Sequence, residues 1–419
     1  MARESFRFIH ASDFHLEVPF QDLPDIPATL RQVFLDAPWR AAESVFEHAV
    51  VENVDFVVLA GDLLSPTTCG ARALAFLVEQ FETLHERGIQ VYWAGGEAEA
   101  AIRLPAGLPL PSNVHCFGNQ GVEVKRFERD GQPIATILGR SRDAGQTVRA
   151  AEYRFEPEGT YAIAVGHGQA DVESLATQSV DYWALGGRHQ MEIVQAEEPT
   201  VAYCGSPQGR AVVEEGPHGF LLVDVDAQHR AQIRPVDVDL VRYSEQDIEV
   251  EDGTDLKAVA SKRVSRLMAE SNGRHLLVKW RLRVDVDALA GLSVNDLDQW
   301  IHWLRHEFGR GQPACWPIGF EVLPPAKFPA SWQDEDTILG DFLRIAEKAR
   351  KRNGGAVDLR PLVETETGGN KRWSSWLALN DQAQQAATLS RSTLMGVELL
   401  RGRKPDLLAG TRRYGGSDE

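Results

Sequence analysis

The alternation of apolar and polar residues near the start of the chain predicts a strand, a helix and a second strand. Phe6 and Phe8 alternate with other residues, as in a strand with one buried face. Residues 38–54 have the periodicity of a helix, with a proline at its first position. Residues 55–60 (DFVVLA) form an almost continuous apolar run, which is typical of a strand buried on both faces. Together these segments predict a βαβ unit.

The same kind of pattern continues to about residue 240. We expect a helix over residues 71–87 and a strand over residues 88–96. Apolar runs predict further strands in the segments PIATILGR, YAIAVGHGQ, DYWALGGRHQ, TVAYCGSPQGR and HGFLLVDVD. The second of these segments ends near His167, and the third ends near Arg188 and His189. Strands that alternate with helices in this way predict an α/β fold.

The composition changes after residue 240. A strand, a helix, a strand, a second helix and a third strand are expected before residue 330. Residues 335–352 and 381–401 then predict two more helices, and the polar end of the chain is expected to be disordered. The predicted domains are therefore residues 1–240, a small α+β cap at residues 241–330, and a helical extension with a polar tail at residues 331–419.

The helix predicted over residues 294–308 has one apolar face. Its residues Leu297, Ile301 and Leu304 are spaced three and four positions apart. Three tryptophans in the same region would suit stacking on nucleobases, but core packing is the preferred interpretation. These tryptophans are Trp300, Trp303 and Trp316.

Two short polar strings follow the first two predicted strands. Asp13 and His15 lie two residues apart, so in an extended segment their side chains project to the same side. Asp62 follows the second strand directly after a glycine. Because ligands of an α/β sheet bind outside the carboxyl ends of its strands, these residues are candidate metal ligands. Either string alone also fits a chance spacing or a simple turn, and their matched placement favours the metal site.

Composition and charge restrict the class of protein. The chain has 419 residues, which predicts about two to three domains. No apolar stretch approaches the roughly 18 residues of a membrane span. Four widely separated cysteines indicate a reducing compartment, so we expect a cytoplasmic protein. The formal net charge of −17 is opposite to that of most proteins that hold nucleic acid unaided, so a DNA substrate would require a partner that supplies much of the affinity.

The order of the motifs resembles that of the calcineurin-like metallophosphoesterases. The set comprises Asp-Phe-His, Gly-Asp, a strand that ends in Gly-Gly, Gly-His-Gly, Ala-Leu-Gly-Gly-Arg-His and Tyr-Cys-Gly-Ser-Pro-Gln-Gly-Arg, within about residues 5 to 240. The last motif is similar to the SbcD-type DNA repair exonuclease branch, which includes bacterial YhaO-like proteins. The resemblance implies a four-layer αββα phosphoesterase core, followed by the α+β cap and the helical extension.

This resemblance also implies two metal ions, usually manganese. The first ion would be bound by Asp13, His15, Asp62 and His189. The second would share Asp62 and take His167, together with an asparagine and a histidine that this sequence lacks. Where the family has these two ligands and its catalytic histidine, this chain has Gly96, Gly187 and Glu97. The site is thus degenerate, with one complete metal site for Mn²⁺ and an incomplete second site.

The missing ligands leave three outcomes open. Arg188 could occupy the space of the second ion as a fixed cation and still bind a phosphate of the substrate. Alternatively, Glu97 or Glu99 could turn inward and supply a replacement carboxylate, or one ion alone could support slow hydrolysis. The alternatives without a role at the site are a surface arginine at Arg188, a solvated acid at Glu97 and a structural histidine at His167.

The primary hypothesis is the nuclease-type subunit of an SbcC/SbcD-like DNA repair complex, which hydrolyses DNA phosphodiesters with bound metal. The resemblance implies two partners, an SMC-like ATPase of the SbcC type and DNA, with no membrane contact, and a homodimer is also compatible. The alternative is a non-catalytic subunit that binds the ATPase and DNA ends, with the C-terminal helices docked on the partner. An intramolecular position for these helices is equally allowed. A phosphodiesterase for small nucleotides is a third hypothesis, which gives the cap and tail no role.

Overall fold

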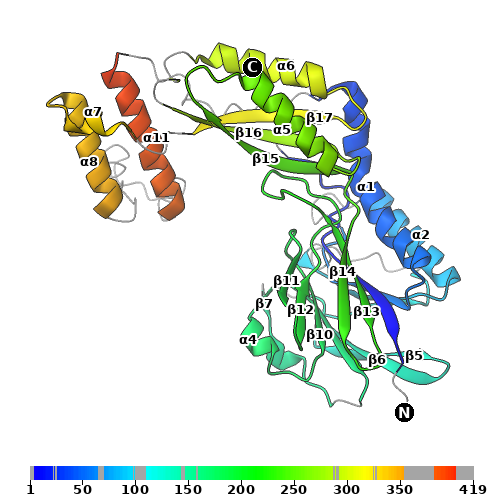
Figure 1. The fold of residues 1–419 in the computed structure, drawn as a ribbon. Coiled ribbons are helices and arrows are strands. Elements are labelled where there is room, and N and C mark those ends of the chain that lie inside the picture. The colour runs from blue at the N-terminus through cyan, green and yellow to red at the C-terminus, as the bar shows by residue number, and fades with distance from the viewer. Residues whose placement is uncertain are drawn as a thin grey trace. The chain divides into compact units, whose positions relative to one another are not determined.

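The computed structural model describes residues 4–21, 23, 26–64, 70–97, 99, 110–142, 147–156, 159–285, 288, 292–323, 325, 328–352 and 382–402. The chain divides into two compact units (Figure 1). The first consists of Met1–Ser244 with Gly273–Leu276, and the second of Glu245–Asn272 with Leu277–Glu419. The three domains predicted from the sequence, with boundaries at residues 240 and 330, stay a prediction. No helix among the described residues has the length and apolar character needed to cross a membrane.

The first unit contains two six-stranded sheets. In spatial order the first sheet comprises β14 (Ala231–Asp237), β13 (Gly219–Val225), β1 (Phe6–Ala11), β2 (Phe56–Leu59), β3 (Gln90–Ala94) and β4 (Val114–Phe117). Strands β1 to β4 are parallel, and β13 pairs antiparallel with β1. The parallel register places Ile9 beside Val57 and Val57 beside Val91. The carboxyl ends of β1, β2 and β3 therefore meet at one edge of this sheet.

The second sheet repeats this plan. In spatial order it comprises β11 (Glu192–Gln195), β12 (Thr200–Tyr203), β10 (Tyr182–Gly186), β8 (Tyr161–His167), β6 (Gln132–Gly139) and β5 (Glu123–Arg129). Its four central strands are parallel, and the outer strands β11 and β5 are antiparallel to their neighbours. Gly186 pairs with His167, so β8 and β10 end side by side.

Three apolar cores hold the first unit together as four layers (Figure 1). Helices α1 (Ala28–Val51) and α2 (Ala71–Glu86) cover the outer face of the first sheet. The inner faces of both sheets share the second core, and a third core lies between the second sheet and η1 (Ala150–Glu152) with α4 (Val172–Leu175). The predicted αββα architecture is confirmed.

The predicted start of the first helix at Pro38 is wrong. Helix α1 begins at Ala28, and Pro38 lies inside it as a buried residue. The preceding residues include Leu30 and Phe34, which bury on the same side of the helix as the residues after Pro38. Burial of this apolar face offsets the hydrogen bond that a proline removes from a helix.

The described part of the second unit is built on a three-stranded sheet of β15 (Val241–Val250), β16 (His275–Val284) and β17 (Cys315–Leu323). Helices α5 (Leu256–Glu270) and α6 (Val294–Phe308) lie between these strands in sequence, so the predicted order of five elements is present. Asp255 caps α5 through two backbone amides, and Ser293 and Asp296 form a capping box on α6. Leu297, Ile301 and Leu304 are buried, as their spacing predicts.

Ion pairs cover polar positions of this sheet. Lys279 contacts Glu245 at 2.8 Å, Arg281 contacts Asp247 at 2.7 Å, and Arg283 contacts Glu249 at 3.2 Å. The cations of β16 are therefore neutralised by acids of β15, and they do not form an unopposed basic surface for phosphates.

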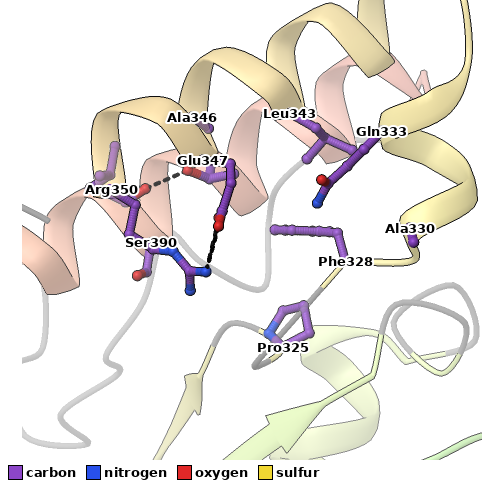
Figure 2. A pocket seen from close by; sticks show the side chains of 11 residues that line it. Pro325, Phe328, Ala330, Gln333, Leu343, Ala346, Glu347, Arg350 and Ser390 are labelled. Atoms are coloured by element: carbon purple, nitrogen blue, oxygen red, sulfur yellow. Dashed lines mark hydrogen bonds and ion pairs between the residues drawn. The ribbon is translucent and has the colours of Figure 1, made fainter. Parts of the chain in front are cut away.

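Within the described residues, three further helices follow the sheet: α7 (Ala330–Asp334), α8 (Ile338–Arg352) and α11 (Gln382–Leu400). A cavity of about 300 Å³ lies among these helices. Phe328, Leu343 and Glu347 are part of its lining (Figure 2). Glu347 accepts a hydrogen bond of 2.9 Å from Arg350. The expected disorder of the polar tail concerns residues outside the described part of the chain.

Candidate metal centre

The loops after β1 and β2 are held together by backbone hydrogen bonds. The Asp13 amide donates to the Gly61 carbonyl at 2.9 Å, and the His15 amide donates to the Asp62 carbonyl at 2.9 Å. Asp13, His15 and Asp62 have positive φ angles of 56°, 43° and 52°. Such backbone conformations are uncommon for residues other than glycine and cluster at functional sites. Both loops thus present their polar side chains at the same sheet edge.

Five predicted residues converge there in two groups. Asp13, His15 and His189 form one group, and Asp13, Asp62 and His167 form the other, with potential ligand atoms within 4.8 Å of one another in each group. The two groups share Asp13. Carboxylate and imidazole donors suit manganese, iron and zinc, so the donor set fits a divalent metal ion.

The distances around His15 connect the two groups. Its Nε2 atom lies 3.0 Å from Nε2 of His189, 3.8 Å from Oδ1 of Asp13 and 3.9 Å from Oδ2 of Asp62. The four residues predicted for the first ion therefore surround one small volume. Their role as metal ligands stays a prediction.

The carboxylate of Asp13 is buried and fixed by two neighbours. The Gly187 amide donates to its Oδ2 atom at 2.9 Å, and the Ser12 hydroxyl donates to the same oxygen. Burial raises the pKa of Asp13, while the charges on His167 and the bond from Ser12 oppose this rise. A buried carboxylate that faces several imidazoles is well suited to a bound cation.

Glu214 orients His189 from behind. Nδ1 of His189 donates to Oε1 of Glu214, which leaves Nε2 facing His15. The bond to Glu214 raises the pKa of His189, and the pKa of Glu214 falls to about 2 because His189 and the Arg210 amide outweigh its burial. Sequence reasoning missed Glu214, which follows the Gly-Arg motif in a turn without any recognisable spacing.

Arg210 is a buried cation behind the same imidazoles. Its guanidinium donates to the Phe14 carbonyl, and its burial lowers its pKa to about 10. Burial and, second, Arg210 lower the pKa of His15 to about 3. His15 is therefore a neutral imidazole at pH 7, which is the form that binds metals.

His167 is oriented by a backbone carbonyl. Its Nδ1 donates to the Ala60 carbonyl at 2.9 Å, and Nε2 lies 3.3 Å from Oδ2 of Asp62. Burial lowers the pKa of His167, but the bond to Asp62 and the nearby charge of Asp13 outweigh it and raise the value to about 9. The side chain thus faces the second group of ligands, where the resemblance expects it.

The two glycines in the second-ion positions leave little room for replacements. A β-carbon on Gly96 would lie 2.6 Å from the Asp62 amide nitrogen and would clash with the Asp62 carboxylate. Gly187 has a φ of 97°, and a β-carbon there would lie 3.2 Å from Nε2 of His167. A side chain at position 96 would therefore meet Asp62, and one at position 187 would meet the Gly168 backbone and His167.

Neither of the nearby glutamates supplies a replacement ligand in this structure. The Glu97 side chain is 67% exposed and pairs with Arg142 at 3.1 Å. Glu99 does turn inward, but both of its carboxylate oxygens accept backbone hydrogen bonds. The sequence left open that Glu99 turns inward and replaces a missing metal ligand. The inward turn is present, but the carboxylate binds backbone amides and not the side chains of the other candidate ligands.

Arg188 lies at the rim of the centre. Its guanidinium stacks on the Tyr203 ring at 4.2 Å and pairs with Glu192 of β11. These contacts hold the side chain along the second sheet, and its proposed role in substrate binding stays a prediction.

The comparisons with known proteins agree with this geometry. Residues 6–191 match the family described as calcineurin-like phosphoesterase. The uncharacterized metallophosphoesterase YhaO of Bacillus subtilis (strain 168) is 34% identical over 232 residues, which cover 52% of this chain and 57% of that protein. The DNA double-strand break repair protein Mre11 of Halobacterium salinarum is 26% identical over 231 residues, which cover 52% of this chain and 56% of that protein. The protein of the same name from Methanopyrus kandleri is 25% identical over 275 residues, with coverages of 56% and 58%.

The chain thus spans about half the length of the curated relatives it matches. The family match covers the strand ends that carry Asp13, His15, Asp62, His167 and His189. Residues 6–191 of this chain form a domain of the calcineurin-like metallophosphoesterase family, whose members bind divalent metal ions.

Proposed function

We propose that this protein binds one Mn²⁺ ion through Asp13, His15, Asp62 and His189 and hydrolyses DNA phosphodiesters as an SbcD-like nuclease subunit. The observation that carries this proposal is the convergence of His15 and His189, whose Nε2 atoms lie 3.0 Å apart beside the Asp13 carboxylate. Two imidazoles that approach so closely, with Glu214 behind one of them, favour a shared cation.

A bound divalent ion would polarise a phosphate oxygen and lower the pKa of a water molecule. The residues of the chain prepare the site for that ion. Glu214 fixes the tautomer of His189, Arg210 favours the neutral form of His15, and the Gly187 amide holds Asp13. These contacts preorganise the donors, which reduces the cost of ordering them when metal binds.

The proposed turnover is slow. Gly96 and Gly187 offer no side-chain donors to a second ion, and the exposed Glu97 stands where the family has its catalytic histidine. A second ion and a general acid each lower the barrier to phosphodiester hydrolysis. Because this chain lacks both, we expect its rate to be lower by roughly several orders of magnitude.

DNA as the substrate is supported by the similarity to the Mre11 repair proteins. The net charge of −17 and the neutralised cations of β16 favour a partner that supplies most of the affinity for DNA. We propose that this partner is an SbcC-like ATPase. The cytoplasmic location stays a prediction, which the widely spaced cysteines support. A homodimer also stays a prediction.

The proposal is tested by counting bound manganese per chain while measuring hydrolysis of linear DNA and of bis-p-nitrophenyl phosphate. We expect about one ion in the wild type and slow, Mn²⁺-dependent cleavage of DNA. His189→Ala should lose both, and His85→Ala, which changes an exposed histidine of α2, should lose neither. Equal metal content in the wild type and His189→Ala contradicts the site. Cleavage of the small ester alone contradicts DNA as the substrate.

A non-catalytic subunit is the second candidate, and the glycines at positions 96 and 187, which offer no side-chain donor to a second ion, favour it. In this case the chain would act through its helices, because α8 exposes Ile338 (75%) and Ile345 (68%) to solvent. Deletion of the chain from residue 335 onward should abolish capture of an SbcC-like ATPase. Ile345→Asp should weaken the capture as well, whereas the matched control Leu35→Asp on α1 should not. Unchanged capture by the deletion variant contradicts this candidate.

A further inference from the structure

The carboxylate of Glu99 accepts four hydrogen bonds from backbone amides. Its Oε1 atom accepts hydrogen bonds from the amides of Leu63 at 2.7 Å and Leu64 at 3.1 Å. Its Oε2 atom accepts from the amides of Asp62 at 2.9 Å and Gly96 at 2.8 Å. A carboxylate offers about four acceptor positions, so the backbone occupies all of them.

These amides belong to two separate loops. Asp62, Leu63 and Leu64 follow β2, and Gly96 follows β3. The loop after β2 uses its carbonyl groups to bind the loop after β1, through the bonds from the amides of Asp13, His15 and Leu16. Its own amides therefore point the other way and need a different acceptor. Glu99 is the acceptor, and it ties the loops after β2 and β3 to each other.

The carboxylate of Asp62 depends on this arrangement. Asp62 has a φ of 52°, a conformation that persists only where the surroundings enforce it. Its carboxylate also packs directly against the α-carbon of Gly96, where a β-carbon would clash. A loop that is free to move at Gly96 would release Asp62 from the position in which it faces His15 and His167.

We propose that Glu99 is a positioning residue that holds Asp62 in its metal-binding conformation through the backbone of the two loops. Glu99 touches neither the ion nor the substrate. In this chain, the inward carboxylate next to the degenerate second site is a structural clamp and not a substitute ligand. The effect of Glu99 on metal affinity rests on the proposed metal site. Its effect on the two loops is independent of whether the site binds a metal.

The sequence provides a matched control two residues away. Glu97 lies in the same loop, has the same side chain, and pairs with Arg142 at 3.1 Å. Glu97→Gln and Glu99→Gln therefore make the same chemical change in the same segment. In Glu99→Gln the side-chain amide would turn N–H groups toward backbone N–H groups, which removes about half of the acceptor positions.

The first measurement is amide hydrogen exchange on the full-length, metal-free protein. In the wild type we expect protection at residues 62–64, and in Glu99→Gln we expect faster exchange there. Glu97→Gln should exchange like the wild type. Fast exchange of these amides in the wild type overturns the clamp, and this result needs no variant to fold. Unchanged exchange in a folded Glu99→Gln variant overturns it too.

The second measurement is Mn²⁺ affinity by calorimetry. Glu99→Gln should bind Mn²⁺ about 10- to 100-fold more weakly, the usual effect of losing a residue that supports a metal ligand. Asp62→Asn separates the two roles, because it should weaken Mn²⁺ binding while the amides of residues 62–64 stay protected. Faster exchange with unchanged Mn²⁺ affinity in Glu99→Gln overturns the positioning role. If the wild type does not bind Mn²⁺, the proposed function is refuted. The exchange data then still show whether Glu99 holds the two loops together.

Discussion

Glu214 accepts a hydrogen bond from Nδ1 of His189, and this bond leaves Nε2 of His189 facing Nε2 of His15. The carboxylate thereby sets the tautomer and the ring orientation of a candidate metal ligand. A second bond, from the Arg210 amide to Oε2 at 2.5 Å, fixes the carboxylate itself. The orientation of His189 therefore depends on a residue that would not touch the ion.

We expect Glu214→Gln to weaken Mn²⁺ binding by about 10- to 100-fold, because the amide side chain no longer enforces the required tautomer. Calorimetry with Mn²⁺ on the full-length protein measures the change. The control is Glu215→Gln, which makes the same chemical change at the next residue, where the carboxylate accepts a hydrogen bond of 3.3 Å from Ser244. Equal affinities of the two variants contradict a role for Glu214 in orienting the ligand.

Bound Mn²⁺ should also stabilise the folded chain. An ion that binds only the native state, at a free concentration of 100 times its dissociation constant, stabilises by about 2.7 kcal/mol. This corresponds to a rise in Tm of roughly 5 °C or more for a unit of this size. A thermal shift assay with and without Mn²⁺ measures it for the wild type.

His15→Ala removes an imidazole of the first ligand group, 3.0 Å from His189 and 3.9 Å from Asp62, and should lose this rise. His85→Ala on the exposed side of α2 should keep it. A rise of the same size in His15→Ala would place the stabilising ion elsewhere.

The position of the candidate metal ligands after strand ends could be predicted from the sequence, because chain order determines where the strands end. Parallel strands end at a common edge, so residues directly after such strands come together even when the sequence separates them widely. Asp13 and Asp62 follow β1 and β2 of the first sheet, and this edge accounts for their proximity. His189 follows β10 of the second sheet, and the packing of the two sheets brings it to Asp13. The α/β class followed from the alternation of strands and helices, and the four-layer architecture followed from the resemblance to the calcineurin-like metallophosphoesterases.

The supporting contacts could not be predicted in this way. The inward turn of Glu99 depends on which backbone amides lack an acceptor, and this is decided only after the loops have packed. Glu214 lies in a turn, where no periodicity indicates the direction of a side chain. The start of α1 at Ala28 was missed because Pro38 was interpreted as the first helical residue. The helix includes Pro38 because it buries apolar residues both before and after this proline.

Restoring the family's asparagine should not restore the second metal site. In Gly96→Asn the new β-carbon would clash with the Asp62 carboxylate, which must then move away from His15. We therefore expect Gly96→Asn to bind less Mn²⁺ than the wild type, with no second ion per chain. Metal content measured after equilibration with Mn²⁺ gives the answer.

The matched control for this substitution is Gly121→Asn, because a β-carbon at Gly121 would meet open space. Its metal content should equal that of the wild type. Two ions per chain in Gly96→Asn would show that the loop has room to rearrange and that the second site is latent.

The tryptophans of the second unit should contribute to stability and not to nucleobase stacking. Trp300 is 3% exposed, its ring packs edge-on against Trp280 at 5.3 Å, and its Nε1 donates to the Leu256 carbonyl at 3.3 Å. A ring with its faces covered by α5, α6 and β16 has no surface for a base. Trp300→Ala should therefore lower the free energy of unfolding by about 3–5 kcal/mol, the usual cost of a large cavity.

Urea unfolding followed by circular dichroism measures this loss, and Trp303→Ala is the comparison. Trp303 is only half-buried and packs against Phe308 at 5.8 Å, so its removal leaves a smaller cavity and should cost less. Titration with single-stranded oligonucleotide should show no difference between folded variants. Near-normal stability together with weaker oligonucleotide binding in Trp300→Ala would instead mean that this ring leaves the core to bind nucleic acid.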